Sequence, residues 1–217
     1  MNFADYPYAE NIANSLTHGV GVIIFLVLCP MLIATAVYTA YARKISGAVI
    51  FSFGLLAVYM SSTLFHAMPD KVTRGILHYF DLCSIYFLIS GTYTPFLLIY
   101  FRSKLGKFLL ILVWVLTTIG ITMQIVADHV PFFYTLVIYL GMGWIGLLLI
   151  RPAIIKLKPL VLWLLLIGGL SYTFGTYFIY HDDKVWYYHA IWHIFVLTGS
   201  LSHFLAVYLA LKDKVRN

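Results

Sequence analysis

The chain has 217 residues, of which 62% are hydrophobic and only 10% are charged. An ordinary soluble domain carries about 25% charged residues, so this composition excludes a water-soluble globular protein. The net charge of +6 comes from basic residues that are spread over short segments without a run or a recognition motif. We therefore expect no nucleic-acid partner.

Seven apolar stretches take up nearly the whole sequence. A helical span needs roughly 20 mostly apolar residues, and only helices and closed barrels satisfy their backbone groups in lipid. The long apolar runs lack strand alternation, which excludes the barrel and predicts an all-α integral membrane protein with a single seven-helix domain over residues 1–217. The predicted spans lie near 17–42, 45–66, 76–101, 107–127, 131–150, 159–180 and 185–211.

The segment before the first span and the small residues inside later spans give two further expectations. The first sixteen residues contain Asp5 and Glu10 but neither a basic residue nor a cleavage pattern, so we expect no removable signal. Small residues are typical of places where membrane helices approach closely. Close packing is accordingly expected at Gly141, Gly143 and Gly146 of the fifth span and at Gly199, Ser200 and Ser202 of the seventh.

Basic residues are concentrated on one side of the predicted bundle. Seven spans place the N-terminus and connections 2–3, 4–5 and 6–7 on one face, and the other connections and the C-terminus on the opposite face. The C-terminal side holds eleven of the fourteen basic residues, and the N-terminal side holds only Lys71, Arg74 and Lys184. The positive-inside rule then predicts a multi-pass protein of the cell (inner) membrane with a cytoplasmic C-terminus.

Histidines gather on the N-terminal side, together with most acidic residues. Ser62 and His66 stand four residues apart at the end of the second span, and His189 and His193 stand four apart at the start of the seventh. Each pair shares a helix face. His78 and Asp81 form a third such pair at the start of the third span. Polar groups inside a span are costly, turn inward and mark function, so the sequence predicts that all three pairs meet at similar depth.

Three neutral imidazoles suit Zn²⁺ and leave a fourth tetrahedral position for water, which is the pattern of catalytic zinc sites. We therefore predict that His66, His189 and His193 bind Zn²⁺. Asp81, three residues after His78 in the third span, could hold the water as a general base.

The remaining histidines have a simpler interpretation. His129, His181 and His203 are expected to be hydrogen-bonding groups of the membrane interface rather than ligands. For His18 and His78 the sequence leaves both alternatives open. Two histidines at helical spacing can also simply hydrogen-bond across helices, and the metal interpretation therefore depends on the combination of both pairs with an intramembrane Asp.

Several segments resemble the hemolysin III family, the bacterial branch of the progestin and adipoQ receptor (PAQR) superfamily. They are ENIANSLTHG (10–19), SSTLFHA (61–67), HYFDLCSIYFLISGTYTPF (78–96), YLGMGW (139–144) and HAIWHIFVLTGSLSHF (189–204), in the order expected for that family. The resemblance covers essentially the whole chain.

The resemblance implies roles for the same residues. His66, His189 and His193 would be zinc ligands, Asp81 would position the zinc-bound water, and Ser62 would line the site. Adiponectin receptors and alkaline ceramidases share this arrangement, which implies hydrolysis of a ceramide-like lipid amide. The receptors place their N-terminus and zinc inside the cell, which is the reverse of the orientation predicted from the charge bias.

The leading interpretation is a zinc-binding membrane protein with a hydrolase site for lipid amides, in which Ser62 could donate a hydrogen bond to the developing oxyanion. Its partners would be membrane lipids, one of them as substrate. A second interpretation is a non-catalytic homeostasis or sensing protein in which zinc only joins the second and seventh spans. A cytolytic pore ranks last, because the fourth to sixth spans hold almost no ionisable residues between their ends.

Overall fold

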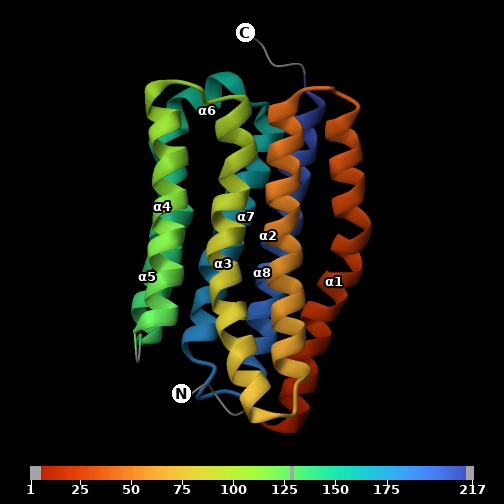
Figure 1. Ribbon diagram of the computed structural model, residues 1–217, viewed down its shortest axis with the longest axis vertical. Coiled ribbons are helices and arrows are strands. Elements are labelled where there is room, and N and C mark those ends of the chain that lie inside the picture. Colours follow the sequence, from red (N-terminus) through yellow and green to blue (C-terminus); the bar gives the residue numbers. More distant parts are fainter. Residues whose placement is uncertain (1–5, 128–129, 214–217) are drawn as a thin grey trace.

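The computed structural model describes residues 6–127 and 130–213. All of its regular elements in these residues are helices. They are α1 (Tyr8–Val37), α2 (Ala42–Ala67), α3 (Lys71–Ile99), α4 (Lys104–Val126), α5 (Phe132–Trp144), the 3-10 helix η1 (Ile145–Leu149), α6 (Ile150–Lys156), α7 (Pro159–Tyr180) and α8 (Tyr188–Lys212) (Figure 1). Because α5, η1 and α6 together form one span, seven segments of the described residues are long and apolar enough to cross a membrane.

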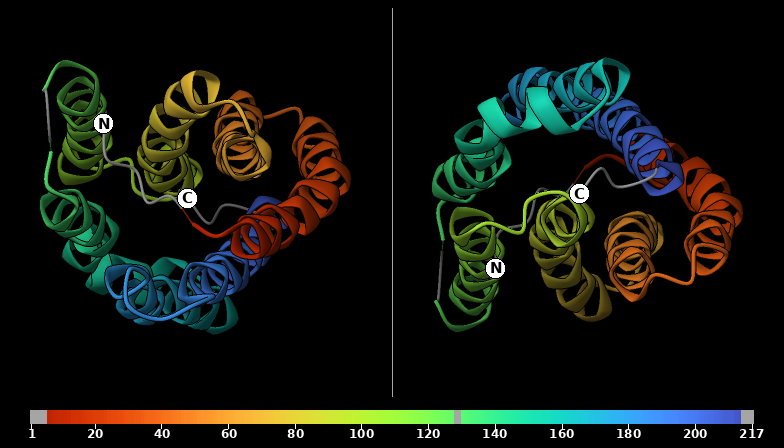
Figure 2. Two further views of the ribbon diagram at one scale, coloured as in Figure 1. Left: turned by 90° about the horizontal axis from the view of Figure 1, so that it is seen from below. Right: turned by 90° about the horizontal axis from the view of Figure 1, so that it is seen from above.

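The spans form a closed ring. Each packs against its neighbour along the chain, α5 contacts α7, and α1 closes the ring against α8 (Figure 2). The first turn of α1 and the last turn of α8 lie at opposite ends of the bundle, which we call the N-terminal face and the C-terminal face (Figure 1). The protein is thus a seven-helix membrane bundle, as predicted, whereas its orientation in the membrane stays a prediction.

The backbones of α2 and α3 approach each other closely along their length. A Cβ atom on Gly47 would come within 2.8 Å of Pro95 Cα, and one on Gly54 within 3.0 Å of Leu88 Cα. A side chain at Gly47 would force the two helices apart, and one at Gly54 would make a very tight contact, so both glycines allow this close packing. The close pairing fixes the end of α2, which carries Ser62 and His66, against the α3 segment that carries Asp81.

Two predicted spans differ from the observed helices in a way that matters for function. The first was expected near 17–42, but α1 begins at Tyr8, and Glu10 is only 2% exposed. The fifth was expected as one helix near 131–150, but α5 ends at Trp144 and the span continues through η1 and α6. The expected close packing at Gly141 and Gly143 is wrong, because a Cβ atom on either would meet nothing within 4 Å.

Candidate metal centre

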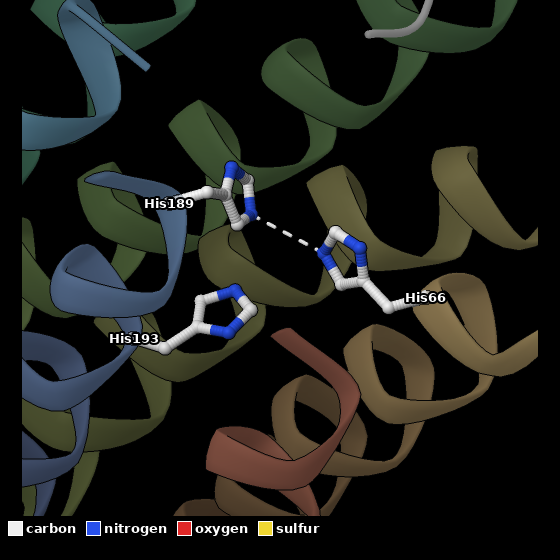
Figure 3. Close-up of side chains that lie close together, drawn as sticks. All are labelled: His66, His189 and His193. Atoms are coloured by element: carbon white, nitrogen blue, oxygen red, sulfur yellow. Dashed lines mark hydrogen bonds between the residues drawn. The ribbon is translucent and has the colours of Figure 1, made fainter. Parts of the chain in front are cut away.

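Three histidines from two helices meet near the N-terminal face. His66 lies in the last turn of α2, and His189 and His193 lie in the first turns of α8. One nitrogen from each ring lies within 4.8 Å of the other two, and all three side chains are buried. His66 Nε2 is 3.2 Å from His189 Nε2, and the three rings turn toward one another (Figure 3). The predicted convergence of His66 with His189 and His193 is confirmed.

The other nitrogen of each ring faces a hydrogen-bond acceptor. His189 Nδ1 is 2.7 Å from Asp182 Oδ2, and His193 Nδ1 is 3.0 Å from the Asn14 carbonyl oxygen. His66 Nδ1 is 3.4 Å from Asn11 Oδ1, an oxygen that also accepts a hydrogen bond from Arg74. The Thr17 hydroxyl, 3.0 Å from His193 Nδ1, donates to backbone carbonyls, so it too can accept from the ring. A proton on each Nδ1 therefore satisfies these contacts and leaves each Nε2 lone pair to bind a metal.

The three-histidine group could hold a divalent metal ion. With both Nδ1 atoms protonated, the Nε2 lone pairs of His66 and His189 face each other and would repel without a cation between them. Two nitrogens bound to one tetrahedral zinc at about 2.0–2.1 Å are about 3.3 Å apart, close to the observed 3.2 Å. Metal-bound histidines usually donate their second N–H to a carboxylate or carbonyl, as these rings do.

Residues near the start of the chain complete the hydrogen-bond network around the three histidines. The Tyr6 hydroxyl donates to Asp182 Oδ2 and lies 2.7 Å from His189 Nδ1, and its ring packs against His66 and His189. Asn11 Nδ2 holds the Tyr6 carbonyl at 2.7 Å. Burial and, next, the negative charge of Asp182 raise the pKa of the Tyr6 phenol, which therefore stays protonated and acts as a donor.

A buried carboxylate ties this segment to α8. Glu10 Oε1 accepts a hydrogen bond of 3.0 Å from the backbone N–H of Tyr187, the residue immediately before α8. Tyr187 has a left-handed φ of 65°, a conformation that is uncommon for a residue with a side chain. Glu10 thus fixes the turn that aims His189 at the cluster. Sequence periodicity identified neither Tyr6 nor Asp182 as part of the site.

Asp81 and Ser62 lie on the wall of the same cavity as His189 and His193, outside the three-histidine group. Ser62 is 1% exposed. Its hydroxyl is close enough to interact with the Asp81 carboxyl, but it makes no hydrogen bond of ordinary length and angle to a described residue. The predicted roles of Asp81 and Ser62 stay predictions.

The other histidines are placed as follows. His18 on α1 is buried and stacks on His193, with ring centroids 3.5 Å apart. His78 lines the cavity beside Phe65. His181 bonds the Tyr177 carbonyl near the N-terminal face, whereas His203 is not interfacial and bonds the Leu165 carbonyl inside the bundle. His129 lies outside the described residues.

A cavity of about 930 Å³ begins at His189 and His193 and extends along the inside of the bundle. Tyr6, Asp81 and His189 line its N-terminal end, while Phe101 and Leu157 line its other end. Most of the surface between them is apolar, contributed by α3, the interrupted fifth span, α7 and α8. The polar cluster therefore stands at one end of a long apolar chamber.

The contact between Asp182 and His189 Nδ1 gives a direct test of the metal assignment. Asp182→Asn removes the carboxylate that orients His189, and we expect about 10- to 100-fold weaker zinc binding in a titration of the purified protein. Tyr6→Phe keeps the ring contacts but removes the hydroxyl, and should weaken binding less. Asp183→Asn, which changes the exposed neighbouring acid, is the matched control. Equal zinc affinities for the Asp182 and Asp183 variants would contradict the assigned role.

Fold and site together define a class, the seven-helix membrane proteins with a buried three-histidine cluster at the end of an apolar chamber. The Haemolysin-III related family profile matches residues 6–204. The chain is 40% identical over 202 residues to the Hemolysin-3 homolog of Bacillus subtilis (strain 168), covering 93% of this chain and 94% of that protein. It is 35% identical over 198 residues to Hemolysin-3 of Bacillus cereus, covering 91% and 90%.

The chain is also similar, at lower identity, to an animal protein. The chain is 30% identical over 212 residues to the human Monocyte to macrophage differentiation factor, covering 92% of this chain and 83% of that protein. The chain therefore belongs to the haemolysin III family of the PAQR superfamily. It is a multi-pass membrane protein, and in bacteria such proteins lie in the cell membrane.

Proposed function

We propose that the protein is a zinc-dependent hydrolase of lipid amides of the ceramide type. The observation that carries this proposal is that three buried imidazole nitrogens converge at the polar end of an apolar cavity whose wall also includes Asp81 and Ser62. Zinc held by His66, His189 and His193 would polarise the substrate carbonyl and activate a water molecule at neutral pH.

The cavity supports a lipid as substrate. Its volume of about 930 Å³ lies within the range of ligand pockets, and its lining is mostly apolar with a few polar groups at one end. An acyl chain would lie along the apolar part between α3, α5, α7 and α8. Its carbonyl carbon would then be next to the three histidines, near the membrane surface.

The chain's own residues would divide the chemistry between them. Asp81 would take a proton from the attacking water and pass it to the leaving amine, so that the C–N bond breaks and a fatty acid and an amine form. Ser62 would donate its hydroxyl proton to the oxygen that gains negative charge. Tyr6 and Asp182 would hold His189 in place, because both contact its Nδ1 atom.

A second candidate is a sensing or homeostasis protein with structural zinc. One observation favours it: α2 and α8 share few direct contacts, so a metal bound by His66, His189 and His193 would join two helices that are otherwise weakly connected. In that case the metal would stabilise the bundle and Asp81 would have no chemical role. The two candidates differ in whether the protein hydrolyses a lipid amide.

The test is fatty-acid release from lipids by the purified protein in nanodiscs. We expect the zinc-loaded protein to release fatty acid from a ceramide, the chelated protein to release none, and added zinc to restore release. Thermal unfolding of the zinc-loaded and chelated samples should be measured in parallel. Full zinc occupancy without release from any ceramide or related amide would refute the hydrolase and favour structural zinc.

A further inference from the structure

Two arginine side chains meet at the C-terminal face, at the end of the bundle opposite the three histidines. Arg43 lies in the first turn of α2, and Arg102 lies in the short connection between α3 and α4, which is at the same face (Figure 1). Arg43 Nη1 donates to the Tyr41 hydroxyl oxygen at 3.2 Å, and Arg102 Nη1 lies 3.5 Å from the same oxygen. Tyr41 thus holds two positive charges around one neutral group.

The backbone fixes this arrangement. Ala40, immediately before Tyr41, has a left-handed φ of 50°, which is uncommon for a residue with a side chain. Such conformations are concentrated at functional sites, including ligand clamps. The contact of Gly47 with Pro95 holds the first turns of α2 beside the last turns of α3. The turn and the helix pairing together therefore bring the two arginines to one place.

No acidic side chain among the described residues compensates the two charges. Asp213 is the only described acid near the C-terminal face, and it pairs with Lys158. Arg43 and Arg102 are both exposed. Their two Nη1 atoms lie closer together than the Debye length of about 8 Å at physiological ionic strength, so the guanidinium groups repel each other. An anion bound by both would replace this repulsion with attraction.

The hydrogen-bonding groups at this point match a phosphate. The Tyr41 hydroxyl oxygen accepts from both arginines, and its own proton has no acceptor among the described residues, so it is left to donate to a ligand. Guanidinium groups bind phosphate oxygens through paired, charge-assisted hydrogen bonds. Three donors of this kind around one point favour a phosphate group over a carboxylate, which has fewer oxygens.

The outer surface of the bundle below the arginine pair is apolar. Phe53 lies ten residues after Arg43, which places it about 15 Å further along α2. Trp114 lies ten residues after Lys104 and so at a similar depth on α4. Both rings contact Phe87 of α3, with centroids 5.7 Å and 6.0 Å apart. None of the three aromatic residues lines the inner cavity, and Phe53 is exposed, so this row faces the membrane.

We propose that Tyr41, Arg43 and Arg102 bind the headgroup phosphate of an anionic phospholipid in the leaflet that adjoins the C-terminal face. The acyl chains of that lipid lie on the aromatic row formed by Phe53, Phe87 and Trp114. Basic pockets between membrane helices bind anionic headgroups in this way. A lipid with a choline headgroup brings its own positive charge to the arginines and is disfavoured. The site does not depend on the proposed function, because it lies at the other end of the bundle.

Short-chain lipids added to the purified full-length protein in a neutral detergent test the site. Dioctanoyl phosphatidylglycerol carries a negative charge, dioctanoyl phosphatidylcholine carries no net charge, and inorganic phosphate lacks acyl chains. Calorimetric titration gives the affinity and stoichiometry of each. We expect one phosphatidylglycerol per chain and weaker binding of the other two. Arg43→Gln combined with Arg102→Gln should weaken phosphatidylglycerol binding about 30-fold, because each arginine near a membrane surface contributes about fivefold.

Arg151→Gln combined with Lys212→Gln is the matched control, because it removes the same charge from exposed positions of the same face. It should leave the affinity for phosphatidylglycerol unchanged, and thermal unfolding verifies that both double variants are folded. Equal losses in the two double variants would show that only the net charge of the face attracts the lipid, and would overturn the site. Equal affinities for the two lipids would overturn it as well. Inorganic phosphate that binds as tightly as phosphatidylglycerol would make the pair a site for a free anion and refute the lipid.

Discussion

Replacing His193 with alanine should reduce the zinc content of the purified protein from about one ion per chain to a small fraction of that value. Three imidazoles and one further ligand complete the tetrahedron that zinc prefers, and two protein ligands hold it far less well. His193 is 1% exposed, and its Nδ1 is fixed by Asn14, so its ring cannot be replaced by a neighbouring side chain without rearrangement. Metal analysis after extensive dialysis measures the effect.

His181→Ala is the matched control, because His181 lies near the same membrane face but bonds only the Tyr177 carbonyl among the interactions described above. It should keep full zinc content. A His193→Ala variant that no longer folds would lose zinc for a trivial reason, so helix content and thermal unfolding must be measured on the same samples. A folded double variant, His189→Ala with His193→Ala, that still holds one zinc per chain would exclude the assigned site.

Helical periodicity was sufficient to find the three histidines. His189 and His193 are four residues apart at the start of one span, and Ser62 and His66 stand four apart at the end of another, so each pair shares a face. Alternating spans then bring the end of α2 and the start of α8 to the same side of the membrane. Because both local spacing and span order are written in the sequence, the cluster could be predicted without a structure.

The residues around the cluster could not be found in this way. Tyr6 and Asp182 lie in segments without a regular period, and their meeting at His189 depends on how the chain folds outside the spans. The early start of α1 was missed because Glu10 has the sequence context of a solvent-exposed acid. In the structure its carboxylate is buried and accepts a hydrogen bond from the Tyr187 N–H. The presence of several acids and histidines on one face was the only signal available.

The interruption of the fifth span was missed for a related reason. Gly141, Gly143 and Gly146 resemble a helix-packing pattern, and sequence alone does not distinguish close packing from a break. In the structure, Tyr93 supplies the donor and acceptor that the 3-10 segment needs, and Tyr93 lies about fifty residues earlier in the chain. A partner so distant in sequence cannot be inferred from the local pattern.

Asp81→Asn should separate catalysis from metal binding. Asp81 lines the cavity beside Ser62 but lies outside the three-histidine group. The amide has nearly the same shape and cannot accept a proton from water, so zinc content should stay near that of the unaltered protein. Fatty-acid release should fall by about 10²–10⁴-fold, the range typical of removing a general base, and the loss should appear in kcat.

The control for that experiment is Asp183→Asn, which changes the charge near the same membrane face without touching the cavity wall and should keep both zinc and activity. If Asp81→Asn instead loses its zinc, the carboxylate is a fourth ligand and the metal has no open position for water or substrate. If it keeps zinc and full activity, another group must act as the base. Only a variant that retains the metal and loses turnover supports a hydrolase in which Asp81 moves the proton while three histidines hold the zinc.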